Sequence, residues 1–180
     1  MLLEDLQEVT SLMPSASLTS LLGPPERLRP ARSQAWRSVE EWLGRELPAD
    51  YKEFVDGYGD ALLYGHLFVP HPEGADPLLT FMREERDSFQ EAYGGLRDIP
   101  PALTAVWEDI VPWAYHDWNG DVCLLFPDAG TKQWRVAVAF RQCPEFLLLD
   151  GGIAEFLENT LREEPPPGLA FHGAALAVHA

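Results

Sequence analysis

The apolar positions in the first half of the chain recur at helical spacing. Between residues 36 and 47 every third or fourth position is apolar, which predicts a helix that stops at Pro48, because the residue before a proline avoids helical backbone angles. A second helix is predicted from Pro48, with an apolar stripe over residues 51–58 and with Gly57 or Gly59 available as a left-handed terminator.

A short extended stretch and a third helix follow. Residues 61–69 are rich in strand-forming residues and are predicted as one strand, closed by Pro70. Asp76 and Pro77 together are typical of a helix start, the first as a cap and the second as the first helical residue. We therefore expect a helix from there to the glycine pair at 94–95.

The second half of the chain changes to period two. Strands are predicted over 110–116 and 122–126, joined by a tight hairpin in which Asn119 and Gly120 tolerate positive φ. Residues 134–141 alternate between large apolar and other side chains, which predicts a strand with one buried face. A strand over 145–149 follows, and a closing helix after the glycine pair at 151–152.

This order of elements predicts an α+β fold, with helices at the N-terminal side packed on a mainly antiparallel sheet and a closing C-terminal helix. Three parts are expected along the chain. Residues 1–35, broken by several prolines, form an N-terminal arm with a short helix; residues 36–164 form the domain; residues 165–180 form a proline-led tail.

Charge narrows the range of functions. The 180 residues carry 13 basic and 29 acidic side chains, a net charge of −16, and residues 48–180 account for 22 acids and 8 bases, or −14. Nucleic-acid binding draws most of its affinity from Lys and Arg, so a net negative domain disfavours it. The same field attracts a basic protein partner.

The cellular compartment is predicted from cysteine usage and hydropathy. Cys123 and Cys143 lie in apolar segments, no signal peptide opens the sequence, and no stretch reaches the roughly 20 apolar residues of a membrane span. We expect a cytoplasmic protein without a membrane interaction. Both cysteines are interpreted as small buried hydrophobes, with a nucleophilic role as the weaker alternative.

Signatures of cofactor and metal sites are not found in the sequence. Gly130 lacks the earlier glycine of a phosphate loop, and neither cysteine has a partner at zinc-ligand spacing. The alternating oxygens of Asp117, Asn119 and Asp121 resemble a fragment of a calcium loop, although turn chemistry explains them better. We expect no cofactor and no metal.

Two side chains near the hairpin have two interpretations each. His116 next to Asp117 could act as a general acid or base, but neighbours on a strand point to opposite faces, and a solvated surface histidine is the simpler interpretation. Trp118 lies between aspartates at the hairpin tip, where it could anchor an interface or fold back over its own sheet. We expect the other tryptophans, at 36, 42, 107, 113 and 134, to pack in the core.

The order of landmarks resembles the SUKH superfamily. The resemblance rests on Trp42-Leu43, on Leu47-Pro48-Ala49-Asp50-Tyr51-Lys52-Glu53-Phe54-Val55 with Tyr58-Gly59, on Leu67-Phe68-Val69-Pro70-His71-Pro72, on Ile110-Val111-Pro112-Trp113-Ala114, on the Asn119-Gly120-Asp121 turn, on Trp134-Arg135-Val136, and on Gly151-Gly152-Ile153-Ala154-Glu155-Phe156-Leu157. It spans about residues 35–162. It implies a non-enzymatic binding domain, commonly a bacterial immunity protein that holds a secreted toxin inactive.

Three functions follow as hypotheses. The leading one is an immunity protein that neutralises a basic toxin such as a nuclease. The second is a regulatory or scaffold domain that binds an endogenous protein, with the arginine-bearing arm as a candidate contact. The third is an enzyme that uses His116 with Asp117, or a carboxylate pair. The predicted contact surface consists of acidic groups near strand ends and turns with one apolar anchor: Asp60, Glu73, Asp76, Asp117, Trp118, Asp121 and Asp128.

Overall fold

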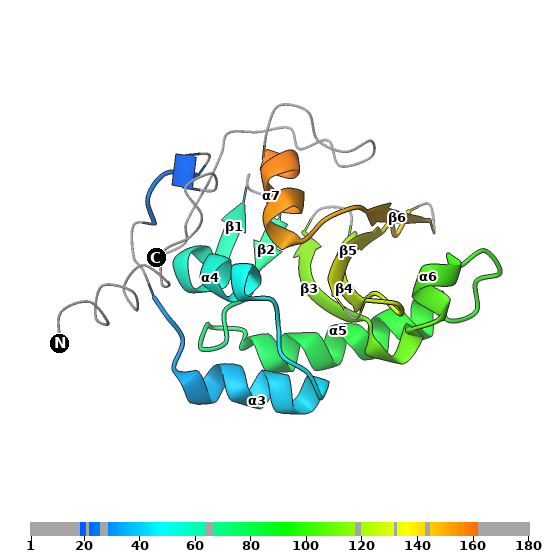
Figure 1. The fold of residues 1–180 in the computed structure, drawn as a ribbon, viewed down its shortest axis with the longest axis horizontal. Coiled ribbons are helices and arrows are strands. Elements are labelled where there is room, and N and C mark those ends of the chain that lie inside the picture. Colours follow the sequence, from blue (N-terminus) through cyan, green and yellow to red (C-terminus); the bar gives the residue numbers. More distant parts are fainter. Residues whose placement is uncertain are drawn as a thin grey trace.

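A single antiparallel sheet organises the protein. The computed structural model describes residues 19–20, 22–25, 29–63, 67–117, 120–131, 133–142 and 145–161 (Figure 1). Six strands lie in the order β1-β2-β3-β4-β5-β6, and each neighbouring pair is antiparallel. With its helices, this sheet confirms the predicted α+β class.

The strands are β1 (Ala61–Leu63), β2 (Leu67–Val69), β3 (Val111–His116), β4 (Val122–Pro127), β5 (Trp134–Ala139) and β6 (Phe146–Leu149). The helices are α3 (Ser33–Leu43), α4 (Ala49–Tyr58), α5 (Leu78–Tyr93), α6 (Pro101–Thr104) and α7 (Ile153–Leu161), with a 3-10 turn at Trp107–Asp109. Within these described ranges, no helix combines the length and apolar character needed to cross a bilayer.

Helices cover both faces of the sheet, and α7 and α5 lie on opposite sides of the strands in Figure 1. One face packs with α3, α4, α7 and the start of α5 around the fully buried Trp113. The other face packs with the end of α5 and with α6 around Phe89 and Leu124. The sheet is therefore the middle layer between two apolar cores.

Three helix termini differ from the sequence prediction. The first helix ends at Leu43, ahead of the predicted stop at Pro48, because Gly44 adopts the left-handed conformation (φ 70°) and its N–H bonds back to the last turn. Gly59 was predicted as a left-handed terminator but has φ −64°. Asp76 makes no side-chain cap at α5, where Pro77 occupies the capping position.

The predicted strand over 61–69 is two strands. Ala61 pairs with Val69 and Leu63 with Leu67, so the chain reverses between them. The buried side chains are those of residues 61, 63, 67 and 69. The odd-numbered positions therefore face the core in both strands, as they would in one continuous strand. Periodicity alone could not reveal the turn.

The β3–β4 hairpin is wider than a two-residue turn. His116 and Asp121 close it through a 2.8 Å backbone hydrogen bond, which leaves residues 117–120 as the loop. Gly120 has the expected positive φ of 74°, whereas Asn119 lies outside the described residues. The loop residues that are described include Asp117, which is exposed.

Strand β5 has two buried faces, although its alternation predicted one. Val136 and Val138 pack toward α4 and α7, and Ala137 and Ala139 pack in the opposite core. Alanine is small enough to let a helix lie close to the sheet, so a position that resembles a solvent-facing one is buried instead.

Candidate functional site

Two of the predicted contact residues lie within electrostatic range of one tyrosine at the edge of the core around Trp113. The negative charges of Asp76 and Asp117 raise the pKa of the Tyr115 hydroxyl, and so does the charge of Glu85 on α5. We define the acidic aromatic patch as Phe68, Asp76, Glu85, Tyr115 and Asp117. Asp76 and Asp117 are exposed, and the other three are half-buried.

Strand pairing and helix packing place these side chains. Phe68 on β2 lies opposite Tyr115 on β3, and their ring centroids are 5.4 Å apart. Phe81 stacks on Tyr115 with ring centroids 5.8 Å apart, and Glu85 follows Phe81 by one helical turn on the same face of α5. Asp76 comes just before α5 and Asp117 just after β3.

The patch has a surplus of negative charge. The pKa of Tyr115 is raised by burial and then by the charges of Asp76, Asp117 and Glu85. The pKa of Glu85 is raised by burial and by Glu84, against which Arg141 acts in the lowering direction. A cation brought to this site would therefore be attracted by the carboxylates around Tyr115.

Two other predicted contact residues are engaged within the protein. Asp121 is only 5% exposed, and its Oδ1 accepts the N–H of Arg141 at 2.9 Å, so the expectation of an accessible carboxylate there is wrong. Asp128 accepts the N–H groups of Gly130 and Thr131, which lowers its pKa, and lies 3.7 Å from Arg135. Both carboxylates organise turns.

Asp60 and Glu73 also contact other residues of the protein: Asp60 lies against Gly74, and Glu73 binds Arg32. Asp60 has a positive φ of 62°, and its carboxylate lies so close to Gly74 that a Cβ there would approach it to 2.7 Å. The Glu73 carboxylate accepts the backbone N–H of Arg32 at 2.8 Å and its Nε at 2.6 Å, and these bonds lower its pKa. Glu73 is thus satisfied by the arm.

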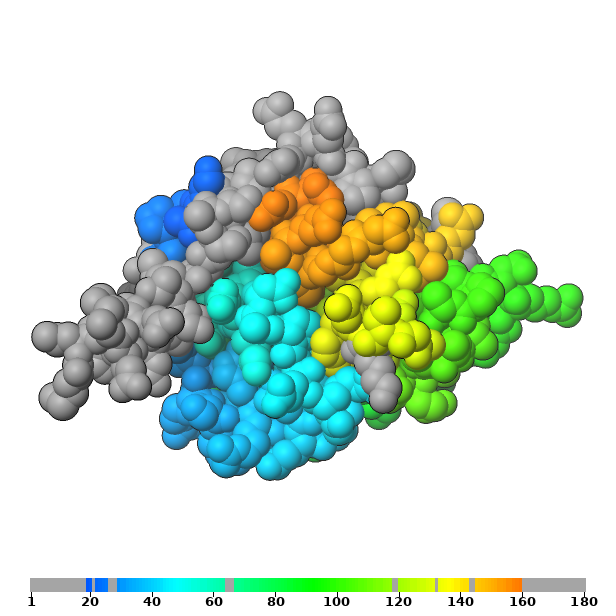
Figure 2. All heavy atoms as spheres, in the orientation of Figure 1, coloured from blue at the N-terminus to red at the C-terminus, as the bar shows by residue number. Residues whose placement is uncertain are grey.

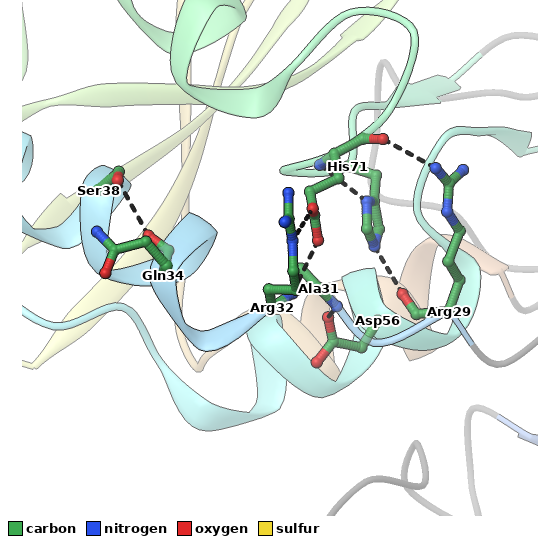
Figure 3. A network of polar contacts seen from close by, with 8 residues as sticks. Arg29, Ala31, Arg32, Gln34, Ser38, Asp56 and His71 are labelled. Atoms are coloured by element: carbon green, nitrogen blue, oxygen red, sulfur yellow. Dashed lines mark hydrogen bonds and ion pairs between the residues drawn. The ribbon is translucent and has the colours of Figure 1, made fainter.

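The described end of the arm, residues 29–32, is fastened to the domain by a network that we call the arm clasp (Figure 3). It consists of Arg29, Ala31 and Arg32 on one side and of Asp56, His71 and Glu73 on the other. Arg29 donates through its backbone N–H to the Asp56 carbonyl and through Nη2 to the Glu73 carbonyl, both at 2.9 Å. The segment before α3 therefore packs as part of the domain.

The histidine of the clasp is neutral by geometry. His71 is 1% exposed; its Nδ1 accepts the N–H of Glu73 at 3.1 Å, and its Nε2 lies 2.7 Å from the carbonyl oxygen of Arg29. A backbone N–H can only donate and a carbonyl can only accept, so the proton is on Nε2. Nε2 therefore holds the arm at Arg29, and Nδ1 holds the domain's own turn at Glu73.

Near the hairpin the predictions had mixed outcomes. His116 is 8% exposed, so the expectation of a solvated histidine is wrong: β3 carries it into the sheet opposite Leu67. Cys123 is buried, as predicted, and burial raises the pKa of its thiol. Cys143 and Trp118 lie outside the described residues.

The expected core tryptophans divide into two groups. Trp36 and Trp113 are buried as predicted, and Trp42, Trp107 and Trp134 are partly buried. Trp134 donates from Nε1 to the Glu46 carbonyl at 2.7 Å, and Trp42 lies under the Arg86 guanidinium at 4.2 Å. These rings join elements at the rim of the core.

Three of the hollows on the described surface have mixed linings. One, of about 750 Å³, lies between α3 and α4 beside the arm clasp. The second, about 600 Å³, is lined by Asp50, Asp128, Trp134, Arg135 and Asp150. The third, about 400 Å³, adjoins the acidic aromatic patch at Glu85 and Arg141. In the part of the chain that the structure describes, no three His, Cys, Asp or Glu side chains converge to hold a metal ion.

Sequence reasoning did not find Phe68, Glu85 or Tyr115. Phe68 and Tyr115 resembled ordinary core aromatics, and Glu85 lies in a charged run that is typical of a solvated helix face. The available signal was the spacing of Phe81 and Glu85, which places a carboxylate one turn from a buried ring.

Comparisons with protein-family models, with curated proteins and with solved structures find no match to this chain.

Proposed function

We propose that this protein is a non-enzymatic acidic binding protein of the SUKH-like immunity type, which neutralises a basic toxin in the cytoplasm. The acidic aromatic patch is the observation that carries the proposal. It presents half-buried rings next to carboxylates whose combined negative charge a partner's cations would offset.

The chemistry of the patch suits Lys and Arg side chains. Their ammonium and guanidinium groups pair with Asp76 and Asp117, and their aliphatic stems and charge lie favourably on aromatic faces such as that of Tyr115. The net charge of −16 adds a long-range field, which accelerates the encounter with a positively charged partner.

Co-expression tests the biological role. The toxin encoded beside this gene is expressed with and without the protein, and rescue of growth is the expected result. Failure with every neighbouring candidate contradicts the immunity role, and a neighbourhood without a toxin gene favours the regulatory or scaffold alternative.

Salt-dependent kinetics test the patch itself. The double variant carries Asp76→Asn and Asp117→Asn. It is expected to associate with the toxin about three- to tenfold more slowly at low salt and with a flatter salt dependence, because two steering charges are lost. The matched control is Glu91→Gln with Asp98→Asn, two exposed carboxylates outside the patch that change the net charge equally. Equal slowing in both variants shows that net charge acts without the patch.

A further inference from the structure

The outer edge of β6 leaves backbone hydrogen-bonding groups unpaired among the described residues. β6 is the last strand of the sheet and pairs with β5 alone. Phe140 donates its N–H to the Glu145 carbonyl at 3.0 Å, so in this register Leu147 and Leu149 also turn their backbone groups toward β5. The N–H and C=O groups of Phe146 and Leu148 then point away from the sheet.

This edge is also apolar. All four residues of β6 are half-buried, with Phe146 and Leu148 packed toward one core and Leu147 and Leu149 toward the other. Proteins usually protect exposed edges with lysine, proline or a bulge, and β6 has none of these. The gold atoms at the position of this segment form part of the visible surface beside α7 in Figure 2.

The charged residues at the two ends of β6 indicate which kind of segment could pair with its outer edge. Glu145 and Asp150 flank β6 and both are exposed, and Asp150 also lies 3.2 Å from Arg135. A second copy would bring the same carboxylates to the shared ladder together with its own charge of −16, whereas a basic strand would meet opposite charges. The loops that contain Asp117 and Glu145 lie at the same end of the sheet, because Arg141 donates to Asp121 there.

We propose that an extended segment of a basic protein partner adds to the outer edge of β6 as a seventh strand. This inference rests on the proposed function and deepens it, because it names the backbone groups that such a partner would use. Main-chain bonds to Phe146 and Leu148 supply affinity, and Lys or Arg side chains near Glu145 and Asp150 supply selectivity.

Hydrogen exchange on the unaltered full chain is the first test. The probe is a synthetic hexapeptide of alternating lysine and valine with blocked ends, and the control replaces each lysine by glutamate. At a free concentration about ten times its Kd, the lysine peptide is expected to slow exchange of the Phe146 and Leu148 amides about tenfold. No protection at β6, protection elsewhere, or equal protection by the glutamate peptide overturns the proposal.

A pair of substitutions is the second test. Leu148→Pro removes the outward N–H and the side chain, and Leu148→Ala removes the side chain alone, so their comparison isolates the N–H. We expect the proline variant to bind the lysine peptide at least about tenfold more weakly than the alanine variant, because the ladder to the added strand is broken. Equal affinities overturn the proposal, and the exchange experiment decides the matter if the proline variant does not fold.

The outcomes separate this inference from the proposed function. If Leu148→Pro folds and still rescues growth from the toxin as well as Leu148→Ala does, the immunity role stands and the edge proposal fails. If the unaltered protein rescues no growth, the immunity role itself fails. A dimer that forms with concentration and is lost in Leu148→Pro identifies a second copy as the occupant and also overturns the proposal.

Discussion

Asp56 shows how a buried carboxylate can serve structure at an electrostatic cost. It is 8% exposed, and its Oδ1 accepts both the N–H of Ala31 at 2.8 Å and the indole N–H of Trp36 at 3.2 Å. Burial nevertheless raises its pKa above the ordinary value, because desolvation outweighs these bonds. The geometry needs an acceptor oxygen there, but it does not need the charge.

We therefore predict opposite effects for two substitutions of Asp56. Asn keeps an oxygen for both donors and removes the charge, so Asp56→Asn should keep or raise the free energy of unfolding at neutral pH. Ala leaves both buried donors without a partner, so Asp56→Ala should be less stable than Asp56→Asn by about 1–3 kcal/mol. Chemical denaturation of the two variants measures this difference.

The raised pKa of Asp56 determines how the free energy of unfolding changes with pH. Because the folded state holds the Asp56 proton more tightly than the unfolded state does, ionisation destabilises the fold as pH rises from the ordinary aspartate range through the raised pKa. The advantage of Asp56→Asn over the unaltered protein should therefore be smallest in acid and grow toward neutral pH. An advantage that shrinks as pH rises contradicts the shift.

At the same scale, the sequence shows which residues are charged but not which carboxylates are bound by other residues of the protein. Asp121 is taken up by the backbone of Arg141 and Glu73 by Arg32, contacts that join positions 20 and 41 residues apart. Only the tertiary fold brings such partners together. Asp76 and Asp117 are exposed in the part of the chain that the structure describes.

At the scale of elements, local patterns located most helices and strands but not their environment. The strand over 134–139 was found from its alternation, yet its second buried face depends on the core that Ala137 and Ala139 share with the end of α5 and with α6. The short helix α6 was not predicted, although Pro100 and Pro101 are typical of a helix start. Burial by a distant element leaves no local mark on the sequence.

One tertiary contact acts as a helix cap. Asp50, at the start of α4, accepts the N–H of Ala154 through Oδ2 at 3.2 Å, and α4 and α7 pack together. The first turn of a helix has N–H groups without partners inside the helix, so Asp50 satisfies one that α7 cannot satisfy itself. The glycines at 151 and 152 leave α7 without a capping side chain of its own.

We predict that Asp50→Ala lowers the free energy of unfolding by about 0.5–2 kcal/mol, the usual range for loss of a capping side chain. Exchange should accelerate first at the amide of Ala154. Asp50→Asn is the matched control, because its amide oxygen can still accept the bond. Equal destabilisation by Ala and Asn would show that charge at the helix start matters more than the hydrogen bond.

At the scale of the whole molecule, the excess of carboxylates opposes the compact state. The chain carries −16, and its described ion pairs are at the surface, where each contributes little: Arg32–Glu73, Arg45–Asp109, Lys52–Glu40, Arg135–Asp128 and Arg135–Asp150. Self-repulsion over this surface is the expected dominant electrostatic effect on stability. The same excess is what a basic partner would neutralise.

Salt should therefore stabilise the protein. Raising NaCl from about 10 mM to about 0.3 M shortens the screening length from about 30 Å to below about 8 Å, which weakens repulsion between distant carboxylates more than attraction within close pairs. We expect a gain of about 1 kcal/mol, or a rise in Tm of about 2–4 °C for a chain of this size, measured by calorimetry at pH 7. Near pH 4.5, where the sequence-based isoelectric point lies, the net charge is close to zero and the rise should disappear. A fall in Tm at pH 7 would mean that the surface ion pairs outweigh the repulsion, and a rise that persists at pH 4.5 would assign the effect to hydration instead of charge.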